Sequence, residues 1–135
     1  MRRIALPLLV LAALAVPTAI ATAANPHFVG TPTCTVVNGS QVSCSGKIAG
    51  LGQAPTVVQV QVPFSCTNRG GNQPPGQASG QSGPITPRGG QITFTNVTTA
   101  PAKCPDQMTP TFGPNATINV FQGGTLVFSG AVPIT

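Results

Sequence analysis

Residues 56–66 read TVVQVQVPFSC. From Val58 on, every second side chain is apolar or a cysteine, and the positions between them carry glutamine, proline or serine. This alternation predicts a β-strand with one buried face and one face in water. Pro63 has no N–H to donate to a neighbouring strand, so we expect it at a sheet edge or beside a β-bulge. Other segments after residue 23 repeat the same kind of pattern.

A hairpin over residues 33–48 precedes this strand, with Asn38-Gly39 as its turn signal. A two-residue turn would place Cys34 and Cys44 on opposite faces of the sheet. A three-residue loop that also includes Ser40 brings the two cysteines face to face. Because a slip of one residue turns every side chain to the other face, the apolar pattern and the cysteines both favour the longer loop.

The fold class follows from the series of short alternating segments. No segment after residue 23 has helical periodicity, and the length allows one domain. We predict an all-β, single immunoglobulin-like β-sandwich of about six to eight strands. Its candidate strands are 33–37, 41–48, 56–66, 91–98, 108–112, 116–122 and 125–132. Core candidates on the later strands are Ile92, Phe94, Ile118, Val120, Leu126 and Phe128.

Residues 67–90 are rich in glycine and proline. A structureless loop of that length is unusual inside a compact domain. We therefore expect the segment to contain a short edge strand of small polar residues at about 77–82.

Four cysteines in a small exported domain predict two disulfides. The spacing between successive cysteines is 10, 22 and 38 positions, which does not fit the short pairs of a zinc site. Three pairings are possible in principle. The hairpin favours Cys34–Cys44, which leaves Cys66–Cys104.

Residues 1–23 have the pattern of a secretory signal peptide. Arg2 and Arg3 precede an apolar stretch, and Ala21-Thr22-Ala23 fits a cleavage site. We expect cleavage rather than a membrane anchor, with no membrane insertion afterwards. The secreted domain is then 24–135, with 24–32 as a flexible lead-in.

The charge of the secreted part is small. The full chain carries +5, and removal of the signal peptide leaves +3. The bases that remain are Lys47, Arg69, Arg88 and Lys103, against Asp106 as the one acid. These four basic residues are isolated along the sequence and do not form a patch interleaved with aromatic residues. They therefore do not predict a nucleic-acid partner.

The inventory of catalytic groups is almost empty. Asp106 is the one carboxylate side chain and His27 the one imidazole, whereas most glycosidases need two carboxylates and a hydrolase triad needs a base oriented by an acid. Asp106 fits a turn former. We therefore expect that the protein has no enzymatic activity and binds no cofactor and no metal.

Three asparagines, Asn38, Asn96 and Asn115, lie in N-glycosylation sequons. We interpret them as structural asparagines rather than glycosylation sites.

Several stretches carry a resemblance. They are the hairpin CTVVNGSQVSCSG (34–46), AGLG (49–52), CTNRGGNQPPGQ (66–77) and QGGT (122–125). Together they resemble a family of small secreted proteins of uncharacterised function from high-GC Gram-positive bacteria. The resemblance implies secretion and a β-sandwich, and it brings no activity with it.

The leading hypothesis is a secreted, non-enzymatic protein with an extracellular binding or structural role. Its partner would be a protein, a cell-wall polymer or a small ligand, bound by neutral hydrogen bonds. One alternative is a carrier with an apolar cleft for a small molecule. The other is a protease inhibitor that presents Arg69 from the loop Asn68, Arg69, Gly70, Gly71 and Asn72.

Overall fold

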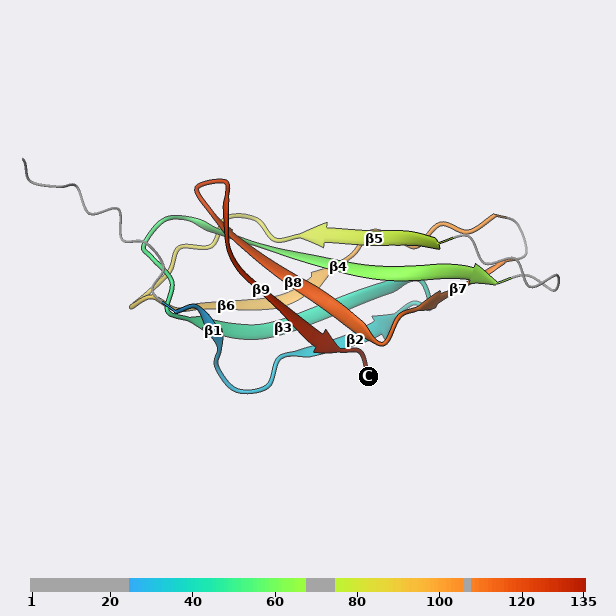
Figure 1. The fold of residues 1–135 in the computed structure, drawn as a ribbon, viewed down its shortest axis with the longest axis horizontal. Helices are drawn as coiled ribbons and strands as arrows, with labels where there is room; N and C mark the ends of the chain where they lie inside the picture. Colours follow the sequence, from blue (N-terminus) through green and yellow to red (C-terminus); the bar gives the residue numbers. More distant parts are fainter. Residues whose placement is uncertain (1–24, 68–74, 106–107) are drawn as a thin grey trace, which may run out of the picture.

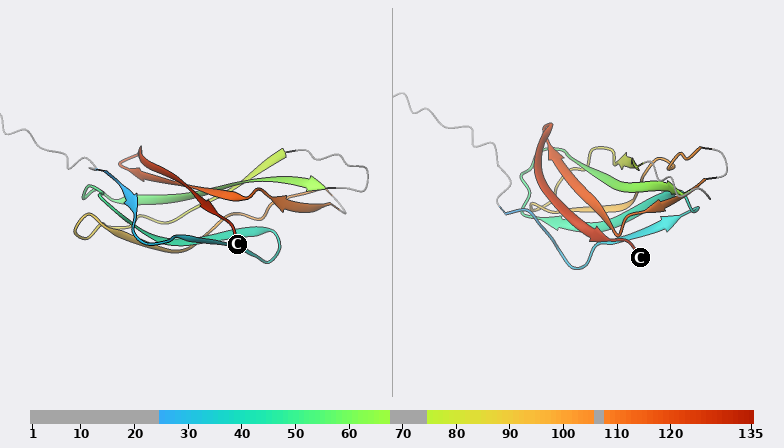
Figure 2. Two further views of the ribbon diagram at one scale, coloured as in Figure 1. Left: turned by 60° about the horizontal axis from the view of Figure 1, so that its bottom comes forward. Right: turned by 45° about the vertical axis from the view of Figure 1, so that its right-hand side comes forward.

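The computed structural model describes residues 25–67, 75–105 and 108–135. Within them the chain forms two antiparallel β-sheets that face one another as two layers, with no helix (Figure 1, Figure 2). The first sheet contains β1 (His27–Phe28), β2 (Thr33–Val37), β3 (Gln41–Ala49) and β6 (Ile92–Thr98). The second contains β4 (Thr56–Thr67), β5 (Pro75–Gln81), β7 (Thr109–Phe112), β8 (Asn115–Gln122) and β9 (Thr125–Pro133). The predicted all-β fold with two sheets is confirmed.

The β2–β3 hairpin has the predicted three-residue loop. Cys34 lies opposite Cys44, and Val37 lies opposite Gln41. Asn38 and Gly39 take φ angles of 53° and 68°, a left-handed conformation that asparagine and glycine adopt more readily than other residues. The loop chemistry is therefore compatible with the register that the cysteines and the apolar pattern favour.

One strand was missed by the sequence pattern. His27–Phe28 forms β1 and pairs with Ala49 and Ile48 of β3, and the Val29 N–H donates to the Lys47 carbonyl at 2.8 Å. Residues 27–29 of the expected lead-in are thus hydrogen-bonded to β3, and the flexibility of 24–32 stays a prediction. A two-residue strand has no periodicity to detect, which is why nine strands are described where six to eight were expected.

Strand β4 is the centre of the second sheet, with β5 on one side and both β8 and β7 on the other. Pro63 lies opposite the point where β7 ends and β8 has not yet begun, and the Gly113 N–H donates to the Pro63 carbonyl at 2.9 Å. A residue's N–H and C=O point to the same side of an antiparallel strand. The N–H that Pro63 lacks would therefore face this interruption, so the proline lies in a central strand, not at a sheet edge, at a point where no neighbouring strand needs that donor.

The edge strand expected at 77–82 is present as β5, Pro75–Gln81. Its inward positions are small because the space is small. A Cβ at Gly80 would lie 2.1 Å from the Thr98 carbonyl oxygen, and one at Gly76 would lie 2.5 Å from the Phe64 ring. Close packing, rather than loop flexibility, accounts for glycine on this strand.

The core lies between the two sheets. Its fully buried side chains include Ile48, Val58, Val60, Val62, Phe94, Ile118, Val120 and Val132, and Ile92 is also buried. Phe128 is half-buried and packs edge to face on Phe28 with ring centroids 5.0 Å apart.

Leu126 is not in the core: 51% of its surface is exposed. Its predicted burial is wrong because β9 contains a bulge. Phe128 pairs with Val120, but Leu126 pairs with Phe121, so the register shifts between the two pairs. The shift reverses the phase of the alternation and places Leu126 on the outer face beside Phe121.

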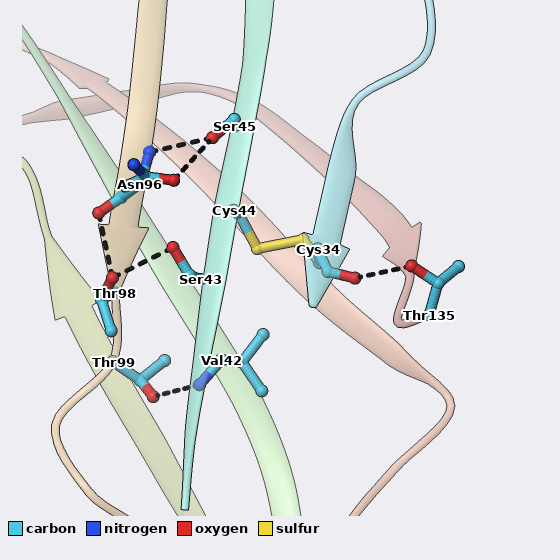
Figure 3. The surroundings of a disulfide bond; sticks show 9 residues. All are labelled: Cys34, Val42, Ser43, Cys44, Ser45, Asn96, Thr98, Thr99 and Thr135. Atoms are coloured by element: carbon cyan, nitrogen blue, oxygen red, sulfur yellow. Dashed lines mark hydrogen bonds between the residues drawn. A yellow bond between two sulfur atoms is a disulfide. The ribbon is translucent and has the colours of Figure 1, made fainter. Parts of the chain in front are cut away.

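Both predicted disulfides are present. Cys34–Cys44 joins directly opposed residues of β2 and β3, with the Cα atoms 4.1 Å apart. Cys66–Cys104 ties the end of β4 to the segment after β6, with the Cα atoms 5.6 Å apart. The C-terminal Thr135 donates a backbone hydrogen bond to the Cys34 carbonyl at 2.9 Å, and its side-chain hydroxyl contacts the same oxygen (Figure 3). Two disulfides indicate an oxidising compartment.

A buried amide holds the connection between β3 and β4. The Gln122 Nε2 group donates to the carbonyls of Gly52 and Ala54 at 2.8 and 3.2 Å. It also contacts the Thr56 hydroxyl at 3.0 Å, and the Gln122 Oε1 accepts from the Gly52 N–H at 3.2 Å. Gln122 is 8% exposed and Thr56 is fully buried. Every hydrogen-bonding atom of this side chain is therefore used inside the protein.

Candidate functional site

The outer face of the second sheet carries a continuous row of neutral polar side chains. Gln81 lies opposite Gln59, Gln59 opposite Asn119, and Asn119 opposite Ser129. These four residues, the amide row, run across β5, β4, β8 and β9. Neighbouring strands lie about 4.8 Å apart, so the row extends over about 14 Å.

Two parallel rows flank the amide row. One contains Ser79, Gln61, Thr117 and Ala131, again on successive strands. The other is apolar and contains Val57, Phe121 and Leu126. The outer face thus presents amides and hydroxyls beside one apolar strip that includes a phenyl ring.

The hydrogen bonds within this face leave donors for a ligand. The Asn119 Nδ2 group donates to the Oε1 atoms of Gln59 and Gln61 at 3.3 and 3.2 Å. The Ser129 hydroxyl donates to the Asn119 Oδ1 at 2.9 Å. Each glutamine Nε2 carries two N–H donors, and those of Gln59 and Gln61 have no acceptor among the residues that the structure describes. The network holds the glutamines in place while these N–H groups remain accessible.

On the outer face of the first sheet, several hydroxyls have hydrogen-bond partners within the protein. The Thr98 hydroxyl contacts the Ser43 hydroxyl at 3.1 Å, and the Ser45 hydroxyl accepts from the Asn96 N–H at 2.9 Å (Figure 3). Asn96 lies at a bulge with φ of 50°, which supports the structural interpretation of this asparagine. Unlike the amide row, this face also carries a charged residue, Lys47.

A second candidate site was not predicted from the sequence. Lys47 and Arg88 line one cavity of about 300 Å³ with Ile85, Thr86, Gln91, Ile92 and Thr93. The two cations are far apart in the sequence. Lys47 pairs with Thr93 across β3 and β6, and the segment that contains Arg88 directly precedes β6, so both side chains reach the same cavity. Only the sheet register could have revealed this, because no local motif links the two residues.

The other described cavities are of similar size. One of about 270 Å³ is lined by Pro63, Phe64, Ser65, Thr111, Phe112 and Gly113. Another of about 320 Å³ has Phe64, Gln77, Ala78, Ser79, Ala100, Pro101 and Lys103 around it. These volumes lie near the lower limit for a small-molecule site, and each lining mixes polar with apolar residues. None of the three favours a carrier for an apolar ligand.

The site residues predicted from the sequence fall into two groups. The loop Asn68–Asn72, which includes Arg69, and the turn residue Asp106 lie outside the described residues. His27 is exposed on β1, where its Nδ1 lies 2.8 Å from the Asn25 carbonyl. No group of three potential metal ligands occurs in the part of the chain that the structure describes. The same residues contain no helix that is long and apolar enough to cross a membrane.

No family model matches the chain, and neither does any curated protein or solved structure. The two candidate sites therefore depend on the geometry of this chain alone.

Proposed function

We propose that the chain is a secreted, non-enzymatic binding protein that holds a neutral, hydroxyl-rich polymer, such as a cell-wall polysaccharide, on the outer face of its second sheet. The amide row carries this proposal, since it aligns Gln81, Gln59, Asn119 and Ser129 across four strands. A row of this length suits an extended polymer better than a compact small molecule.

The chemistry of the face matches polysaccharide hydroxyls. A sugar hydroxyl both donates and accepts, and a side-chain amide does the same with its two ends. The apolar strip with Phe121 can pack against the C–H face of a sugar ring. Phe121 is half-buried and Leu126 is half exposed, so the strip is partly accessible.

The lack of charge supports a binding role of this kind. The residues that the structure describes include no aspartate or glutamate side chain, and the amide row and its flanking rows contain no charged residue. Association through such a face depends little on electrostatic steering. Binding should therefore change little with salt concentration.

Secretion belongs to the same proposal. Two disulfides agree with an extracellular location, and residues 1–23 have the signal-peptide pattern. The immunoglobulin-like assignment of the two-sheet fold is likewise part of the proposal. An extracellular chain would meet wall polymer directly after export.

A co-sedimentation assay with purified insoluble cell wall tests the proposal. The variant Gln59→Leu/Gln61→Leu removes the free N–H donors of the face, and each lost hydrogen bond is worth about 0.5–1.5 kcal/mol. We expect binding about tenfold weaker than wild type, since about 1.4 kcal/mol corresponds to a factor of ten. The matched control Thr35→Val/Ser43→Ala alters the outer face of the other sheet and should bind like wild type.

Equal binding by wild type and the glutamine variant would contradict the proposal. So would capture that depends on a wall-associated protein, which protease treatment of the wall would reveal. Release of soluble fragments from the polymer by the purified chain would contradict the non-enzymatic part.

A further inference from the structure

The cavity of Lys47 and Arg88 lies on a different part of the molecule from the amide row. Lys47 is on β3, Thr93 is on β6, and Thr86, Arg88 and Gln91 come from the connection between β5 and β6 (yellow in Figure 1). Lys47 and Thr93 face outward from the first sheet, since Ile48 and Ile92, the next residue pair, are buried. The two sites are therefore independent.

The cavity gathers most of the positive charge that the structure describes. Lys47, Arg88 and Lys103 are the lysine and arginine residues within the described ranges, and two of the three line this one cavity. No carboxylate side chain lies among the lining residues to neutralise the two cations. Both positive charges would attract an anion that enters the cavity.

The position of Arg88 is fixed by its turn. Arg88 and Gln91 exchange two backbone hydrogen bonds of 2.9 and 3.1 Å, and Gly89 and Gly90 between them have φ angles of 58° and 73°. The Leu51 N–H donates to the Gly90 carbonyl at 2.9 Å, which ties the turn to the body of the sandwich. The Arg88 side chain thus extends from a turn whose backbone is hydrogen-bonded at both ends and to the segment after β3.

We propose that this cavity binds a tetrahedral dianion, a phosphate or sulfate group. Two positive charges match two negative charges. The hydroxyls of Thr86 and Thr93 and the amide of Gln91 supply neutral donors around them. A guanidinium binds such oxyanions with paired N–H donors, and a lysine adds a point charge. The volume of about 300 Å³ has room for the anion and for part of an organic group attached to it.

An NMR titration of the uniformly ¹⁵N-labelled secreted chain tests this proposal. The probes are inorganic phosphate, sulfate, glycerol phosphate and acetate, each added at constant ionic strength. We expect saturable shifts of the backbone amides of Thr86, Arg88 and Thr93 with the three dianions. Acetate should bind at least about tenfold more weakly, since it presents one charge instead of two.

Three variants localise the site. Lys47→Gln and Arg88→Gln should each weaken phosphate binding about tenfold, because each removes a charge-assisted hydrogen bond. Lys103→Gln is the matched control, since Lys103 lines a different cavity, and it should leave the affinity unchanged. All three side chains are exposed, and the ¹⁵N spectrum itself shows whether each variant folds.

The outcomes separate the possible sources of the anion. Binding of inorganic phosphate without glycerol phosphate identifies a free ion as the ligand, and binding of both identifies a phosphate ester. The absence of saturable shifts with any dianion would overturn the proposal. Equal weakening by Lys103→Gln and Arg88→Gln, or acetate binding as tight as sulfate binding, would also overturn it.

Discussion

Replacement of Gln122 by methionine tests how the sandwich is held at one end. Methionine keeps the length and approximate volume of the side chain but removes the amide. Four contacts disappear: those with the Gly52 N–H, the Gly52 and Ala54 carbonyls and the Thr56 hydroxyl. The connection between β3 and β4 then loses its tie to β8.

The expected cost follows from burial. Each hydrogen bond contributes about 1 kcal/mol net, and a buried polar group left without a partner costs about 1–3 kcal/mol. Gln122 is 8% exposed, so water replaces the lost contacts only in part. We expect a loss of about 3–4 kcal/mol, against a total of about 5–15 kcal/mol for a domain of this kind.

Urea unfolding of the oxidised protein measures this loss. The midpoint should fall by about 2 M, given typical slopes for small domains. The matched control is Gln59→Met, which removes one hydrogen bond on the half-buried outer face and should cost about 1 kcal/mol or less. If Gln122→Met and Gln59→Met destabilise equally, the buried amide does not hold the connection.

Four further variants have definite expected effects on the free energy of unfolding. The double variant Cys66→Ala/Cys104→Ala opens a loop with a sequence separation of 38 and should cost about 4 kcal/mol in urea unfolding; a cost under about 1 kcal/mol would contradict the chain-entropy estimate. Gly80→Ala, whose Cβ would lie 2.1 Å from a backbone oxygen, should cost at least about 2 kcal/mol. Gly83→Ala meets nothing within 4 Å and should be neutral or slightly stabilising; similar losses for both glycines would argue against close packing of β5. Leu126→Ser replaces a residue that is 51% exposed, so it should lower the free energy of unfolding, measured by thermal denaturation, by no more than about 0.5 kcal/mol. A loss as large as that of a buried leucine would contradict the outward placement of Leu126.

Much of the fold could be predicted because strand periodicity and turn chemistry agree. In the β2–β3 hairpin the apolar alternation and the cysteines both require one register, Asn38-Gly39 is compatible with it, and the structure has it. The position of the edge strand β5 could be predicted, but the reason for its glycines could not. Its glycines fit against the Phe64 ring and the Thr98 backbone, and such distant contacts leave no mark on the local sequence.

The errors share a physical origin in the pairing of strands. The bulge that exposes Leu126 arises between β8 and β9 and is not encoded by alternation within β9 alone. Gln122 continues the inward phase of Ile118 and Val120, so its burial could have been inferred from that phase. The cavity of Lys47 and Arg88 needed the β3–β6 register, which no short motif specifies.

The free N–H donors of Gln59 in the amide row and of Gln61 in the row beside it are central to the proposed binding, and their own NMR signals report on them directly. Side-chain NH₂ resonances of ¹⁵N-labelled protein should be followed during titration with a soluble neutral oligosaccharide prepared from the wall polymer. We expect saturable shifts of the Gln59 and Gln61 side-chain resonances, unchanged by added salt. Saturable binding that leaves these two resonances in place and shifts residues of the first sheet would contradict it.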